Sequence, residues 1–274
     1  MKTNGGAPLT VAIGSLGTVG LAVARRLDGG IPGLRLVAVS ARNADKAKRA
    51  ITGFANPAPV LPLNALAEAA DVIVECAPPT CFMEIAGPAV EKGRILMPLS
   101  VTTLLEHMDL VERAKATGAR IIVPTGALLG LDAVRGVAEG KVHSVVMMTR
   151  KPPKGLANAK FVVEQGIDLS DLKEPLKLYE GSVRQAAAMF PANVNIAVAL
   201  GLAGIGVDET RYQVWADPGV DRNTHSIKVD SDSTRFEMTI ENIPTEENPA
   251  TGKNTALSVI AALRRLTAHF SVGT

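Results

Sequence analysis

The 274-residue chain has few cysteines, few aromatic residues and little net charge, and each shortage excludes a class of protein. Its two cysteines, Cys76 and Cys81, are too few for a disulfide framework in a chain of this size. Aromatic residues make up only 3%, which argues against a stacking platform for single-stranded nucleic acid. Lys plus Arg number 29 against 27 for Asp plus Glu, so the basic excess typical of nucleic-acid binders is missing.

Long apolar segments are missing as well. No run of about 18 apolar residues is present to span a membrane, and Met1–Pro8 lacks the apolar core of a signal peptide. We therefore expect a cytoplasmic protein with no nucleic-acid or membrane partner. Hydrophobic residues make up 47% of the chain, which excludes disorder as the main state, and the length predicts about two domains.

The first half of the chain alternates short apolar runs with amphipathic stretches. Most of the runs are almost continuously apolar, as is typical of strands buried on both faces of a parallel sheet. Between them, Val19, Val23 and Leu27 recur at the four-residue spacing of a helix. This order predicts an α/β fold with a Rossmann-type, doubly wound parallel sheet. The expected strands are Leu9–Ile13, Leu34–Ser40, Asp71–Cys76, Ile95–Leu99 and Arg120–Val123.

The pattern changes near Pro124. Ser182 is a suitable N-cap for a helix through Phe190, and later segments alternate apolar with polar residues. We expect a strand at Ser144–Met148 and half-exposed antiparallel strands at Arg211–Trp215, His225–Val229 and Arg235–Ile240. The second domain is therefore α+β, and a homodimer or higher homo-oligomer would cover its open sheet face. The expected domains are 1–125, completed by a C-terminal helical segment 246–274, and a catalytic domain 126–245.

A glycine-rich turn follows the first expected strand and opens the first expected helix. Gly14, Gly17 and Gly20 allow a sharp turn and let a phosphate approach bare backbone, while the helix N-terminus attracts the pyrophosphate. In this context the turn predicts a dinucleotide-binding site. The cofactor-binding residues expected here are Gly14, Leu16, Gly17, Thr18, Val19 and Gly20.

The ends of the next two strands bear on the cofactor. No carboxylate follows the second strand, where NAD enzymes place one against the ribose; Ser40 and Arg42 stand there instead. Because the guanidinium of arginine is a good donor to a 2′-phosphate, we favour NADP over NAD. The alternative is that Arg42 is a solvated surface residue with no role in binding. Cys76 and Ala77 end the third strand, where ligands collect, and we interpret Cys76 as a packed neighbour of the cofactor rather than a nucleophile.

From Pro124 onward the chain resembles the L-aspartate dehydrogenases. The likeness runs in order over most of the remaining residues and is more specific than the glycine turn. The blocks that carry it are Pro124–Ala127, Gly130–Ala133, Thr149–Pro153, Phe190–Asn195, Leu202–Asp208, Ala216–Pro218, Asn223–His225, Glu241–Pro244 and Asn248–Pro249.

The resemblance implies oxidation of L-aspartate to iminoaspartate with NAD or NADP, or the reverse amination of oxaloacetate. It also implies that His225 is catalytic and that Ala127 and Asn195 contact the cofactor. A histidine with an ordinary pKa of about 6.5 suits a proton-handling role, and a contact to a substrate carboxylate is its other candidate role. A dicarboxylate amino acid substrate needs cations, for which Arg150, Lys151 and Arg222 are candidates.

Two departures from the family pattern leave the substrate open. Thr102 and Thr103 replace the small residues usual after a Ser-Val pair, and Leu129 is bulkier than usual in its block. One alternative is therefore a dehydrogenase of another small amino or keto acid, and a second is an NADP-binding sensor without turnover. Metal chemistry is not expected, because the cysteines and histidines show no ligand spacing.

Overall fold

The structure, a computed structural model, describes residues 7–191, 194–248 and 251–273. These residues form two compact units. The first unit contains the described residues up to Gly126 together with Thr255–Ser271, and the second unit contains Ala127–Asn254 and the described residues after Ser271. Ala192, Asn193 and Pro249, which belong to the blocks that carry the family resemblance, lie outside the described residues.

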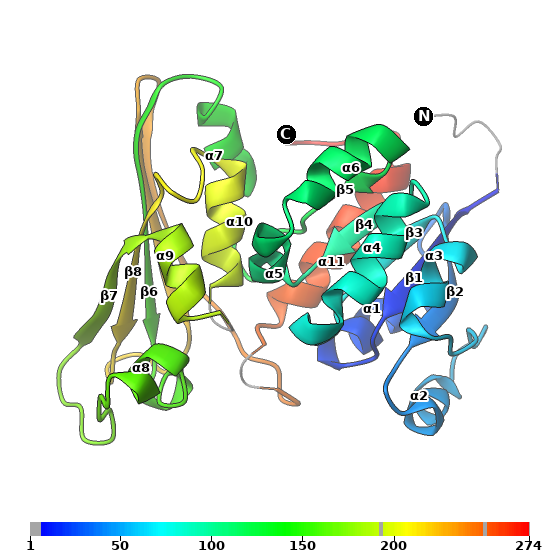
Figure 1. The fold of residues 1–274 in the computed structure, drawn as a ribbon, viewed down its shortest axis with the longest axis horizontal. Helices are drawn as coiled ribbons and strands as arrows, with labels where there is room; N and C mark the ends of the chain where they lie inside the picture. The colour runs from blue at the N-terminus through cyan, green and yellow to red at the C-terminus, as the bar shows by residue number, and fades with distance from the viewer. Residues whose placement is uncertain (1–6, 192–193, 249–250, 274) are drawn as a thin grey trace. The chain divides into compact units, whose positions relative to one another are not determined.

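The first unit is a parallel sheet in the order β2-β1-β3-β4-β5, flanked by helices (Figure 1). This is the doubly wound sheet that the sequence predicts. Its strands are β1 (Leu9–Gly14), β2 (Leu34–Ser40), β3 (Val72–Glu75), β4 (Ile95–Pro98) and β5 (Arg120–Ile121). Its helices are α1 (Thr18–Asp28), α2 (Ala44–Ile51), α3 (Leu66–Ala69), α4 (Phe82–Glu91), α5 (Val101–Glu106), α6 (Asp109–Thr117) and α11 (Asn254–Thr267), with 3₁₀ turns η1 (Leu63–Ala65) and η2 (Pro79–Cys81).

Two hydrophobic clusters cover the two faces of this sheet. Val11 and Ile13 of β1 point into one cluster, and Ala12 between them points into the other. The strands therefore need apolar residues at consecutive positions, because successive side chains point to opposite faces. This burial on both faces explains the nearly unbroken apolar runs of the sequence.

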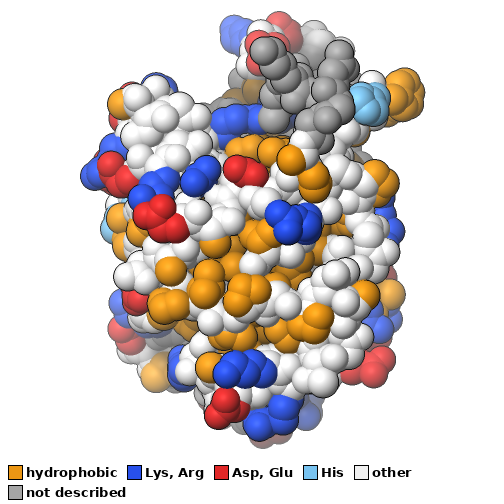
Figure 2. All heavy atoms as spheres, turned by 90° about the vertical axis from the view of Figure 1, so that its right-hand side faces the viewer, with side chains coloured by type: hydrophobic (Ala, Val, Ile, Leu, Met, Phe, Trp, Pro, Cys, Tyr) orange, Lys and Arg blue, Asp and Glu red, His pale blue; other side chains and the backbone are white. Residues whose placement is uncertain are grey.

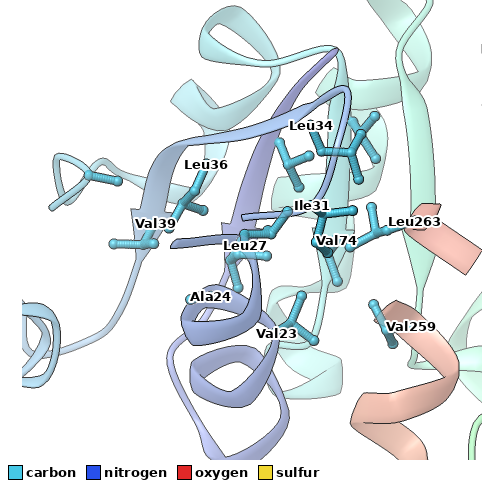
Figure 3. Close-up of a cluster of buried hydrophobic side chains, with 14 of the residues drawn as sticks. Val23, Ala24, Leu27, Ile31, Leu34, Leu36, Val39, Val74, Val259 and Leu263 are labelled. Atoms are coloured by element: carbon cyan, nitrogen blue, oxygen red, sulfur yellow. The ribbon is translucent and has the colours of Figure 1, made fainter. Parts of the chain in front are cut away.

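Helix α11 completes the core of the first unit from the far end of the chain. Its side chains Val259 and Leu263 are fully buried and lie beside Val74 and Ile31 in the cluster drawn in Figure 3. The Thr267 hydroxyl adds a hydrogen bond of 2.9 Å to the carbonyl oxygen of Pro32.

The second unit is a mixed sheet in the order β10-β9-β6-β8-β7, with α7, α9 and α10 on one face (Figure 1). Its strands are β6 (Val142–Lys151), β7 (Leu176–Ser182), β8 (Arg211–Ala216), β9 (Thr224–Ser231) and β10 (Arg235–Glu241). Its helices are α7 (Leu131–Val137), α8 (Lys160–Glu164), α9 (Val183–Met189) and α10 (Asn195–Ala203), with the 3₁₀ turn η3 (Pro153–Gly155).

Two features of this sheet differ from the sequence-based expectation. The expected strands are not all antiparallel, because β8 runs parallel to β6. Parallel neighbours need a long crossover connection, and the segment between β6 and β8, which contains α8, α9 and α10, provides it. Strand β7 was not expected, because a bulge between Lys177 and Tyr179 breaks its alternation and buries both Leu178 and Tyr179. The expected helix after Ser182 is confirmed, with the Ser182 hydroxyl accepting from the Gln185 backbone N–H in a capping box.

Charged and hydrophobic side chains are mixed on one face of the molecule (Figure 2). On the face drawn in Figure 2, lysine and arginine side chains are interspersed with aspartate and glutamate around a central hydrophobic area. Among the helices in the described ranges, none has both the length and the apolar character needed to cross a membrane.

Candidate functional site

The strand order of the first unit fixes where a ligand belongs. Strand β1 lies between β2 and β3, so the chain changes direction across the sheet between β1 and β3. In open α/β sheets, ligands bind at the carboxyl ends of the strands beside such a switch point. Here those ends carry Gly14 and, directly after Glu75, Cys76.

Two of the three glycines lie in close packing, which excludes a side chain at Gly20 and leaves little room for one at Gly14. A Cβ at Gly14 would lie 2.7 Å from the Ile85 Cδ1 atom, and one at Gly20 would collide with the Ser15 carbonyl oxygen. Ser15 itself has a φ of 122°, which is rare for a residue with a side chain. These contacts hold the turn tightly against the sheet.

The third glycine, Gly17, faces open space instead. A Cβ there would meet nothing nearer than the Ser15 hydroxyl oxygen at 4.0 Å, and Gly17 is exposed. As N-cap of α1 it supplies no side-chain bond, and the first turn of α1 contains no acidic residue. Bare backbone and an uncompensated helix N-terminus thus coincide, which is the arrangement that fits a pyrophosphate.

The other residues expected in the turn serve it differently. Thr18 is the first residue of α1, so its backbone N–H belongs to the helix N-terminus. The side chains of Leu16 and Val19 pack against the hydrophobic cluster under the sheet. Their packing holds the turn against the sheet, so the backbone of the turn remains available to a ligand.

The end of β2 presents one buried and one exposed polar side chain. Ser40 is 4% exposed at the last position of the strand, and Arg42 is exposed two residues later. The following residue, Asn43, caps α2 by accepting from the Lys46 backbone N–H at 2.8 Å. No ion pair is found for Arg42 among the described residues, which leaves its guanidinium available to an anionic group.

Cys76 is a packed thiol beside the glycine turn. Its Sγ atom lies 3.3 Å from the Ser15 carbonyl oxygen, to which it donates, and burial together with the Glu75 carboxyl raises the pKa of the thiol. A nucleophilic cysteine needs the opposite shift. The next residue, Ala77, is buried at the same edge of the sheet.

Glu75 is a structural centre of this edge that the sequence reasoning missed. Its fully buried carboxyl accepts from the backbone N–H groups of Ala77, Leu99 and Ser100 at 3.0, 3.1 and 3.0 Å, and from the Ser100 hydroxyl. Burial raises the pKa of this carboxyl, whereas these bonds lower it. The Glu75 carboxyl therefore links the loop after β3 to the loop after β4 by hydrogen bonds. The sequence feature that could have indicated this role is a glutamate at the end of an otherwise apolar strand.

In the second unit, the register of the sheet places His225 in a buried polar cluster. His225 of β9 lies opposite Thr149 of β6 and is 3% exposed. Its Nδ1 atom is 3.0 Å from the Thr149 hydroxyl oxygen, which also accepts from the Tyr212 hydroxyl at 2.9 Å. Neither Thr149 nor Tyr212 was expected as a site residue, because nothing in the sequence shows which strands are neighbours.

The environment of His225 shifts its titration far from the ordinary value. Burial, with the Lys151 ammonium adding to it, lowers the pKa of His225 to about 3. The expectation of an ordinary histidine pKa was therefore wrong, and the ring is neutral near pH 7. Lys151 is 8% exposed, and its burial lowers the pKa of its amine to about 8.

The structure distinguishes the three candidate cations. Arg150 donates to the buried Asp217 carboxylate at 2.7 Å and lies over the Trp215 ring on the opposite face of β6 from Thr149. Arg222 pairs with the exposed Asp221. Lys151 shares the face of Thr149 and is near enough to His225 to lower its pKa, so it is the cation beside the expected catalytic residue.

The remaining expected residues occupy the following places. Ala127 lies half-buried in a turn, and Asn195 is the first residue of α10. Thr102 is buried and Thr103 half-buried in α5, whereas Leu129 is 49% exposed. The structure thus brings together the glycine turn with Cys76 and Ala77 in the first unit, and His225 with Thr149 and Lys151 in the second.

Comparison with known proteins extends these observations. Residues 132–266 match the family model "Aspartate dehydrogenase, C-terminal", and residues 16–124 match "Homoserine dehydrogenase, NAD binding domain". The chain is 54% identical to an L-aspartate dehydrogenase of Bradyrhizobium diazoefficiens, over 97% of this chain and 94% of that one. It is 50% identical to L-aspartate dehydrogenase 3 of Bordetella bronchiseptica, over 97% and 98% of the two chains.

Solved structures give the same grouping. The crystal structure of an aspartate dehydrogenase from Thermotoga maritima is similar with a TM-score of 0.74 and 25% identity, covering 97% of this chain and 99% of that one. A homoserine dehydrogenase from Thiobacillus denitrificans is similar in fold with a TM-score of 0.63 and 14% identity, covering 95% and 73% of the chains.

Proposed function

The chain belongs to the L-aspartate dehydrogenase family, and on that premise we propose that it oxidises L-aspartate to iminoaspartate and carries out the reverse amination of oxaloacetate. It is an NAD(P)-dependent amino acid dehydrogenase of the α/β class. The observation that carries the proposal is His225, a neutral, buried histidine held beside the buried cation Lys151. Such a pair suits a substrate that brings carboxylates.

The first unit holds the dinucleotide. When bound, the nicotinamide accepts the hydride that leaves the substrate Cα. Gly17 and the N–H groups at the start of α1 bind the pyrophosphate, while Gly14 and Gly20 keep the turn close to the sheet. Cys76 and Ala77 border the nicotinamide side, and by family resemblance Ala127 and Asn195 are further cofactor contacts.

NADP is the preferred cofactor in this proposal. Arg42 is exposed and without an ion pair in the described part of the chain, and Ser40 ends β2 beside it. No carboxylate stands at this strand end to repel a 2′-phosphate or to bind a 2′-hydroxyl. Guanidinium and hydroxyl groups are both suitable donors to a phosphate.

The second unit holds the substrate. Lys151 binds one substrate carboxylate, and His225 contacts the substrate from the same face of the sheet. A carboxylate placed between them pairs with the ammonium and so offsets the cost of burying that charge. The two groups together orient the Cα–H bond for hydride transfer.

The proposal also covers the oligomeric state of the enzyme and its location in the cell. The open face of the second unit's sheet presents half-buried Val146, Met148 and Trp215 between charged neighbours, a surface that a second copy of the chain would cover. We therefore propose a homodimer. Cys76 and Cys81 are both free thiols, as is usual in the cytoplasm, where we place the enzyme.

An assay of oxaloacetate plus ammonia with NADPH tests this function. Rapid NADPH oxidation, absent when ammonia is omitted, is the expected result. Turnover only with other small keto acids would support the alternative of a dehydrogenase with another substrate, which the departures at Thr102, Thr103 and Leu129 leave open. Tight NADPH binding with no turnover of any acid would reject catalysis in favour of a sensor.

A further inference from the structure

Three neighbouring strands of the second unit carry a buried row of hydrogen-bonding side chains. Thr149 lies on β6, which runs between β8 with Tyr212 and β9 with His225. The three residues are 0%, 1% and 3% exposed, respectively. The Tyr212 hydroxyl is 2.9 Å from the Thr149 oxygen, which is 3.0 Å from His225 Nδ1.

The direction of these bonds follows from counting protons. Tyr212 has one hydroxyl proton, and in the described part of the chain Thr149 is its acceptor. The Thr149 oxygen is then used as an acceptor, and its own proton has His225 Nδ1 as the available partner. If Nδ1 donated to Thr149 instead, either the Thr149 proton or the Tyr212 proton would be buried with no acceptor among the described residues, which costs free energy. Burial also raises the pKa of Tyr212, so its hydroxyl stays protonated.

The row therefore determines which ring nitrogen of His225 carries a proton. Nδ1 accepts from Thr149 and is unprotonated, so in a neutral ring the proton is on Nε2. Burial and Lys151 keep the ring neutral near pH 7 by lowering the pKa to about 3. Within the described ranges Nε2 has no protein partner, and it is not among the fully buried polar atoms that lack one, so it keeps some access to solvent.

We propose that Thr149 and Tyr212 are positioning residues that hold His225 as the Nε2–H tautomer, so that the ring acts on the substrate as a hydrogen-bond donor. The substrate part of this statement rests on the proposed function. A ring already protonated on Nε2 does not take the ammonium proton of an incoming amino acid there. It instead donates to a substrate oxygen, while Lys151 supplies the charge on the same face.

Nitrogen NMR of the full chain, labelled with ¹⁵N-histidine and free of substrate and cofactor, tests the tautomer directly. His225 is assigned from the signals missing in His225→Gln. We expect Nδ1 to resonate as an unprotonated ring nitrogen and Nε2 as a protonated one near pH 7. A protonated Nδ1 would overturn the proposal, and the tautomer itself is read from the wild-type protein, with His225→Gln needed only for the assignment.

Variants test whether the row sets the tautomer. Thr149→Val removes the donor to Nδ1 but keeps the shape, so we expect the His225 signals to move toward those of exchanging tautomers. With aspartate, kcat falls about 10- to 100-fold while the Kd for NADPH is unchanged. Thr149→Ser restores the hydroxyl and should restore both readouts, and Tyr212→Phe should give a smaller change. Unchanged signals in a folded Thr149→Val would contradict the proposal.

The spectra and the assay separate the two claims. An Nε2–H spectrum in a protein that does not turn over aspartate would reject the proposed function and leave the tautomer assignment standing. Aspartate turnover by a protein whose His225 is protonated on Nδ1 would support the proposed function and reject the tautomer assignment. A purely structural role for Thr149 would lower stability without moving the His225 signals in the folded protein.

Discussion

The candidate site of the first unit is formed mainly by backbone groups, whereas that of the second unit is formed by side chains. In the first unit the site is made mainly by backbone: a turn packed too tightly for a Cβ at Gly20, and a helix N-terminus. In the second unit it is made by side chains on neighbouring strands, Thr149, His225 and Lys151. From this difference we expect that substitutions in the glycine turn change mainly cofactor affinity, whereas substitutions of Thr149, His225 or Lys151 change mainly the substrate chemistry.

The largest effect is expected from His225→Ala. Loss of the ring removes a positioned donor to the substrate, so kcat for aspartate should fall about 10²- to 10³-fold. His143→Ala, on an exposed position of β6, is the matched control and should keep wild-type turnover. Steady-state rates of the two variants check this, and turnover of His225→Ala within a few-fold of wild type would remove His225 from the chemistry.

A substitution in the glycine turn should affect cofactor binding instead. In Gly20→Val the added Cβ meets the Ser15 carbonyl oxygen and the Cys76 Sγ atom, so the turn must shift. We expect the Kd for NADPH to rise about 10²-fold. Fluorescence titration measures it. Gly87→Ala in α4, where a Cβ would meet nothing closer than 4.0 Å, is the control and should bind normally.

Removing the buried cation should weaken binding of the carboxylates. Lys151→Met keeps the length of the side chain and loses its charge, so the KM for aspartate should rise about 10- to 100-fold. Lys154→Met, three residues along and exposed, should leave KM unchanged. An unchanged KM in Lys151→Met would assign the carboxylate to another cation.

The same lysine predicts a pH dependence. Burial lowers its pKa to about 8, so its positive charge is present below pH 8 and is lost as the pH rises through that value. Succinate carries two carboxylates and no amine, and its inhibition constant should rise about tenfold per pH unit above pH 8. In Lys151→Met the constant should be higher and flat across this range. A flat profile in the wild type would contradict the assignment.

The smallest effect is expected at the end of β2. Arg42 is exposed, so its contact with a 2′-phosphate is screened by solvent, and Arg42→Ala should reduce the preference for NADP over NAD by about five- to tenfold. The ratio of kcat/KM values for the two cofactors measures this. Arg49→Ala, exposed in α2, is the control. A preference unchanged by Arg42→Ala would reject the role of the guanidinium.

The two units also differ in how far their structures follow from sequence. In the first unit each expected strand is present, and Leu34–Ser40 has the predicted bounds, because burial on both faces demands unbroken apolar runs. The glycine turn was visible for a similar reason, since all its residues are adjacent along the chain. Glu75 was missed because its partners in the loop after β4 are 24 and 25 residues away.

In the second unit, the alternating strands were found but their arrangement was not. Alternation shows that a strand has one buried face and says nothing of its neighbour, so the parallel pairing of β6 with β8 could not be predicted. The same limit hid the polar row, because Thr149 is 76 residues from His225 and 63 from Tyr212. The low pKa of His225 follows from that burial and was equally invisible.

Titration of NADPH into His225→Ala, with turnover measured on the same preparation, tests the division between the units most directly. We predict a wild-type Kd for NADPH together with a loss of aspartate turnover of about 10²-fold or more. Weakened NADPH binding in parallel with the lost turnover would contradict it, since cofactor recognition would then depend on a residue assigned wholly to the substrate.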